Sequence, residues 1–92
     1  MSRILRGEIL IKALLSVMEI REVLAHNLRA LRQAKGLSQE ELAHRAGIDR
    51  TYVSSLERCQ YSATIDVVDR LANVLGVEAA ELLRRSSALQ QR

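Results

Sequence analysis

Residues that end helices alternate along the middle of this sequence with residues that begin them. Gly36 and Gly47 are each followed two positions later by a helix-capping residue, Ser38 and Asp49 respectively. Glycine readily adopts the left-handed backbone that ends a helix, and Ser and Asp side chains accept hydrogen bonds from the free amides of the first turn. We therefore expect residues 37–58 to form two short helices joined by a tight turn. Glu41, three residues after Ser38, completes a capping-box pattern at the first of them.

The same signals predict an all-α fold of five short helices. Thr64 caps a further helix and Gly76 ends it, while apolar residues recur at spacings of three and four, which is the helical period. The chain has no Pro and only 2% aromatic residues, a composition typical of packed helices. Its 92 residues suffice for one compact domain. The predicted helices span residues 19–35, 39–46, 50–58, 65–75 and 78–85.

Two segments flank the predicted domain, which occupies residues 18–85. Residues 1–17 contain a broad apolar stripe broken by charges, which predicts an extra amphipathic N-terminal helix. Met18 is also a plausible start position, so the sequence leaves open whether residues 1–17 are native. A signal peptide would need a cleaner apolar run, and no segment approaches the length of a membrane span. Residues 86–92 are polar and are expected to form a flexible tail.

Charge and residue types exclude several classes of function. The net charge of +3 is compatible with nucleic acid without requiring it. The single cysteine, Cys59, excludes an intramolecular disulfide and multi-thiolate zinc sites, and His26 and His44 lack metal-ligand spacing. No catalytic triad order, paired carboxylates or glycine-rich phosphate loop is present. We expect a cytoplasmic protein that is not an enzyme and has no metal, cofactor or small-molecule ligand.

The second of the two short helices has a polar face with no role in the core. Leu42, Val53 and Leu56 are expected to lock the two helices together. An α-helix fits the major groove of B-DNA, where its N-terminal residues meet the base edges. The side chains left free for base contacts are those of Arg50, Thr51, Ser54 and Ser55.

The sequence resembles the lambda-repressor and Cro-like helix-turn-helix family of the xenobiotic-response-element type. Caps, core positions and turns agree with the family in order and spacing over about residues 23–83. The resemblance implies a compact, five-helix, DNA-binding transcriptional regulator. The matching residues are Leu28-Arg29-x-Leu31-Arg32, Gly36-Leu37-Ser38-Gln39-Glu40-Glu41-Leu42-Ala43, Ala46-Gly47-Ile48, Val53-Ser54-x-Leu56-Glu57-Arg58, Thr64-Ile65-x-x-Val68, Leu71-Ala72-x-Val74-Leu75-Gly76-Val77 and Leu82-Leu83.

The resemblance also implies roles for individual residues. Gln39 matches a glutamine that clamps a phosphate and braces the start of the DNA-reading helix. Arg32 and Glu57 match an internal ion pair between the first and third helices. Arg50, Thr51, Ser54 and Ser55 fall on the positions that face base edges. The candidates for phosphate contacts are Ser38, Gln39, Tyr52, Arg58, Gln60, Tyr61 and Ser62.

The loop after the reading helix departs from the family pattern, which usually has Gly near Cys59 and often Pro near Ala63. Either Cys59 keeps a left-handed backbone at a cost of about 1 kcal/mol or more, or the loop takes another path. The thiol itself is expected to be partly buried and inert.

A single reading helix makes few base contacts, so we expect a homodimer on a palindromic operator. The helix at 78–85 or the one within residues 1–17 would supply the dimer contact. The regulator would act as a repressor. The same sequence pattern suits a protein-interaction adaptor or an antitoxin-like partner protein, whereas two aromatic side chains disfavour RNA binding.

Overall fold

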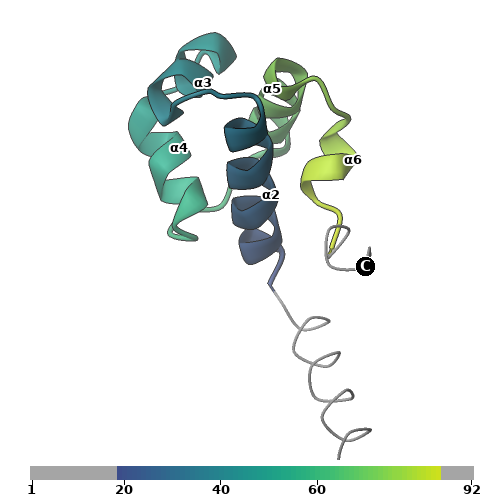
Figure 1. The fold of residues 1–92 in the computed structure, drawn as a ribbon. Helices are drawn as coiled ribbons and strands as arrows, with labels where there is room; N and C mark the ends of the chain where they lie inside the picture. Colours follow the sequence, from purple (N-terminus) through teal and green to yellow (C-terminus); the bar gives the residue numbers. More distant parts are fainter. Residues whose placement is uncertain (1–18, 86–92) are drawn as a thin grey trace, which may run out of the picture.

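The computed structural model describes residues 19–85, which form five helices (Figure 1). The predictions for residues 1–17 and 86–92 fall outside the described residues. The helices α3 and α5 have the predicted bounds, α2 is one residue shorter than predicted at each end, and α4 is one residue shorter at its C-terminal end. The elements are α2 (Ile20–Ala34), α3 (Gln39–Ala46), α4 (Arg50–Glu57), α5 (Ile65–Leu75) and α6 (Ala79–Leu82).

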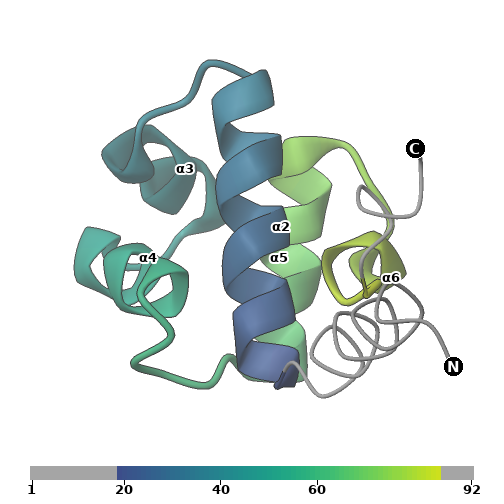
Figure 2. The same cartoon turned by 60° about the horizontal axis from the view of Figure 1, so that its bottom comes forward.

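Helix α2 runs through the middle of the domain (Figures 1 and 2), with α3 and α4 on one side and α5 and α6 on the other. Each helix contributes at least one large, fully buried side chain to a single core. Small residues such as Ala43 and Ala72 are also buried there, which allows the helices to approach closely. The fully buried large side chains are Leu28, Leu42, Val53, Leu56, Leu71 and Leu82.

The predicted helix ends are present with their expected chemistry. Gly47 ends α3 with φ of +73°, a value that glycine adopts without a steric penalty. Thr64 Oγ1 accepts a hydrogen bond of 3.1 Å from the Val67 amide at the start of α5. Ser38 Oγ accepts one of 2.9 Å from the Glu41 amide. The second half of the expected capping box is wrong, because the Glu41 carboxylate instead bonds Arg45, 2.9 Å away.

The last helix is shorter than predicted, ending at Leu82 instead of Arg85. Its final carbonyl groups bond a side chain from another helix in place of a further turn. The Asn27 side-chain amide in α2 donates to the carbonyls of Leu82 and Arg84, each at 3.0 Å. The sequence near α6 cannot predict these hydrogen bonds, because their donor lies on a helix more than fifty residues away. Within residues 19–85 no helix has the length and apolarity to cross a membrane.

Candidate nucleic-acid interface

Helix α4 is fixed to the rest of the domain along one face. Val53 and Leu56 are buried, and both belong to the core cluster that includes Leu42 of α3. Asp49 is the residue directly before α4, and its Oδ1 accepts a hydrogen bond of 2.8 Å from the Thr51 amide. The bond from this amide, followed by the bond from the Thr51 side chain, holds the pKa of Asp49 below its usual value. The capped start of α4 is therefore rigidly positioned, with an ionised cap at neutral pH.

The four residues predicted to read bases lie on the part of α4 that is free of core packing. Arg50 and Thr51 are exposed in the first turn, and Ser54 and Ser55 are half-buried one turn further on. Residues four apart lie above one another on a helix. Arg50 and Ser54 therefore form one row of polar groups and Thr51 and Ser55 form the next.

The predicted phosphate contacts fall into two groups. Ser38 and Gln39 stand at the start of α3, whereas the others lie on α4 or in the loop that follows it. Tyr61 of this loop packs edge-on against Tyr52 of α4, with ring centroids 5.4 Å apart and an interplanar angle of 89°. The two rings border a shallow hollow shared with Thr51 and Ser55. The exposed loop candidates are Arg58, Gln60, Tyr61 and Ser62.

A buried ion pair ties the end of α4 to α2. The Glu57 side chain is 1% exposed, and its Oε2 lies 2.7 Å from Arg32 Nε. Arg32 Nη2 donates to the other carboxylate oxygen at 3.1 Å, so the contact is bidentate. Burial alone would raise the pKa of Glu57, but hydrogen bonds from Arg32 and Gln39 and the charge of Arg29 outweigh it and lower the pKa. The expected Arg32–Glu57 pair is thus present, and its carboxylate is ionised.

Gln39 contacts the opposite end of α4 from the one expected. Its Nε2 donates to Glu57 Oε1 at 2.9 Å, and Glu57 is the last residue of α4. The expected brace at the start of α4 is therefore wrong. The physical reason is that the buried carboxylate needs donors, and the first turn of α3 supplies one.

Arg29 is a positioning residue that the sequence reasoning assigned no role. Its Nη2 donates to the Glu57 carbonyl at 2.9 Å, which satisfies a free acceptor at the end of α4. The available signal was its spacing, because Arg29 precedes Arg32 by one helical turn and both therefore face the same neighbour.

Of the two alternatives for the loop after α4, the structure has the first: Cys59 keeps a left-handed backbone, with φ of +61°. The loop therefore turns as it would with glycine, and the Gln60 amide reaches back to the Ser55 carbonyl at 2.9 Å. The expectation of a partly buried thiol is wrong, because Cys59 is exposed. Its Sγ lies 3.9 Å from the Arg21 carbonyl.

Comparisons with known proteins agree with this geometry. A family model described as helix-turn-helix matches residues 28–82. The "Neisseria hypothetical transcription factor" of Neisseria meningitidis is 48% identical over 71% of this chain and 61% of its own length. "Control protein C.SmaI" of Serratia marcescens is 41% identical over 74% of this chain and 81% of its own. The crystal structure of the restriction-modification controller protein C.AhdI from Aeromonas hydrophila superposes with a TM-score of 0.66 at 44% identity, covering 67% of this chain and 94% of that one.

The chain belongs to the helix-turn-helix family of DNA-binding transcriptional regulators. The all-α, lambda-repressor-like fold predicted from the sequence is confirmed, and the family is not enzymatic. Within residues 19–85 no three His, Cys, Asp or Glu side chains are grouped as a metal site would require.

Proposed function

We propose that α4 is the DNA-reading helix and that its first turn specifies the sequence bound. The observation that supports this most directly is the exposed pair Arg50 and Thr51 at a capped helix start whose other face is buried. Arg presents a planar fork of donors that matches the two acceptors on a guanine edge. Ser54 and Ser55 supply hydroxyl groups one turn along the same groove.

The exposed loop and the start of α3 would hold the DNA backbone on either side of α4. Arg58, Gln60, Tyr61 and Ser62 follow α4 directly, and Ser38 and Gln39 present the amide end of a helix, which favours anions. Tyr52 supports Tyr61 through their edge-on contact. These residues would set register and affinity, whereas the first turn of α4 would set sequence.

We also propose that the protein binds a palindromic operator as a homodimer and represses transcription. An eight-residue helix reaches only a few base pairs, too few for a distinct genomic site. Two copies related by a two-fold axis read half-sites about 34 Å apart, one turn of B-DNA. Its relatives include proteins named as control proteins and transcription factors, which fits regulation by a small DNA-binding chain.

The decisive experiment is selection from a random duplex library at near-physiological salt. Wild type, Arg50→Ala and Arg70→Ala would be compared. Arg70 is exposed on α5, a helix on the other side of α2 from α4 (Figure 1), so its loss is a control for the change in charge. We expect wild type and Arg70→Ala to enrich one palindromic motif that Arg50→Ala loses or relaxes. Folded protein without any enriched motif would contradict sequence-specific regulation and favour the adaptor alternative.

The dimer is tested on the selected site. Inserting five base pairs between the half-sites turns one half-site to the opposite face of the duplex. We expect this insertion to abolish the joint binding of a dimer to both half-sites. Single copies should still bind the separate half-sites weakly. Equal affinity for the original and lengthened sites would contradict a two-fold dimer.

A further inference from the structure

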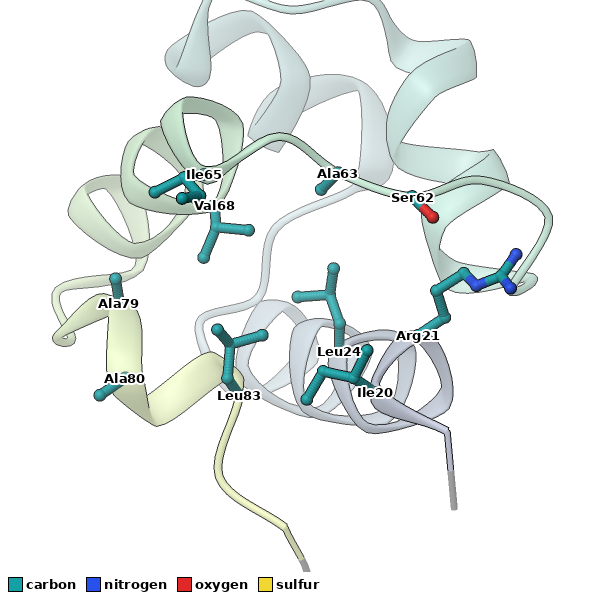
Figure 3. A pocket seen from close by; sticks show the side chains of 10 residues that line it. All are labelled: Ile20, Arg21, Leu24, Ser62, Ala63, Ile65, Val68, Ala79, Ala80 and Leu83. Carbon is teal, nitrogen blue, oxygen red and sulfur yellow. The ribbon is translucent and has the colours of Figure 1, made fainter. Parts of the chain in front are cut away.

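An apolar groove lies between the first turns of α2 and α5 and the short helix α6 (Figure 3). Three large apolar side chains face it and remain strongly exposed: Ile20 at 45%, Ile65 at 85% and Leu83 at 39%. In a domain of this size such a cluster is a marked apolar patch, and patches of this kind mark contact surfaces. The DNA-binding proposal does not use these three residues.

The size and chemistry of the groove suit side chains of a polypeptide better than a small molecule. Its volume is about 250 Å³, below the roughly 300–1,000 Å³ of small-molecule sites. Arg21 and Ser62 stand together at one end of the lining (Figure 3), and the other lining side chains are apolar. An occupant therefore needs an apolar face and few polar groups.

The chain before α2 reaches the domain at the edge of this groove. Glu19 caps α2 with an extended backbone, φ of −69° and ψ of 148°, and its amide bonds Glu22 Oε1 at 3.0 Å. Helix α2 therefore begins at Ile20 and is not a continuation of a longer helix. Because Ile20 itself lines the groove, residues 1–18 are joined through Glu19 to the domain at the rim of the groove.

The sequence of that segment has the required face. Ile11 lies three residues before Leu14 and four before Leu15, and Met18 lies four residues after Leu14 and three after Leu15, which are helical spacings. A helix over residues 4–17 would be about 21 Å long. Direct attachment gives the segment an effective concentration in the millimolar range, which a separate partner rarely reaches.

We infer that residues 4–17 form an amphipathic helix that covers this groove within the same chain. Ile11, Leu14 and Leu15 pack on Ile20, Ile65 and Leu83, and the charged residues of the segment face solvent. The helix thereby completes the apolar core on the side of the domain that α6 leaves partly open.

Amide hydrogen exchange on the full-length chain, resolved by NMR, tests this contact. The variant Ile65→Glu places a charge in the groove at the first position of α5, where an acidic residue is compatible with the helix start. Asn73→Glu is the matched control, because Asn73 is exposed on the same helix and does not line the groove. The amides of Leu28 and Leu71 in the core report whether each variant remains folded.

We expect the amides of residues 9–17 to exchange slowly in wild type and Asn73→Glu, and at least about tenfold faster in Ile65→Glu with the core unchanged. A tenfold dilution of the protein should leave these rates unchanged, since the contact is within one chain. Fast exchange in wild type, or slow exchange that Ile65→Glu does not alter, would overturn the inference. Protection that disappears on dilution would assign the groove to a second copy instead.

Discussion

Removing the Arg32 side-chain charge should destabilise the domain far more than removing a surface arginine. Arg32 is 12% exposed and makes a bidentate contact with a Glu57 carboxylate that is 1% exposed. Arg32→Met keeps most of the aliphatic stem but leaves this carboxylate without its main partner. It also removes the 2.8 Å bond from Arg32 Nη1 to the Leu37 carbonyl.

The expected cost is about 3 kcal/mol. Breaking a buried ion pair typically costs about 3–5 kcal/mol because an uncompensated charge remains buried. The lower end applies here, since Gln39 still donates to the carboxylate at 2.9 Å and Arg29 Nε stays 3.8 Å from it. Small domains are stable by only about 5–15 kcal/mol, so this loss is a large share of the total.

Urea unfolding followed by circular dichroism at neutral pH measures the free energy of unfolding by linear extrapolation. Arg45→Met is the matched control, because Arg45 pairs with Glu41 at 2.9 Å but both side chains are about half exposed. That pair should contribute less than about 1 kcal/mol. If Arg32→Met lowers the free energy of unfolding no more than Arg45→Met does, the buried Glu57 carboxylate does not need Arg32 for stability and the reasoning is refuted.

A double replacement separates loss of contact from exposure of a buried charge. Arg32→Met combined with Glu57→Leu leaves no unpaired carboxylate, so its cost should be smaller than the sum of the two single costs. Additive costs would mean that the two side chains act independently, contrary to their bidentate contact.

Two further predictions concern the end of α4 and the loop after it. The pKa of Glu57 is lowered in the folded state, so its contribution to stability is complete above its usual value of 4.5 and is lost as the pH falls through the lowered value. Glu57→Gln should therefore lose less unfolding free energy than wild type when acidified from about pH 5 to pH 3 in urea titrations; an equal loss would contradict this. Cys59→Gly should stabilise the domain by up to about 1 kcal/mol by relieving a positive φ, measured as a higher urea midpoint; a lower midpoint would contradict the assigned strain.

Local sequence determined most of the helices and their ends. Ser38, Thr64, Gly47 and Gly76 act through neighbouring backbone groups, so their effects can be predicted from a few adjacent residues. The exposed face of α4 also followed from sequence, because helical periodicity separates Val53 and Leu56 from the polar positions around them. The left-handed backbone at Cys59 could be expected only from the resemblance to the family, which usually has Gly near this position. The local propensity of Cys does not predict it.

Tertiary structure alone decided where polar side chains find partners across the fold. Asn27 ends α6 by donating to carbonyls more than fifty positions away, and Gln39 bonds the last residue of α4 instead of bracing its start. Arg29 also caps that end of α4 from another helix. Such choices depend on which buried acceptor lies within about 3 Å once the helices have packed. Helical period and capping describe one segment at a time, whereas these bonds are set by the relative placement of several.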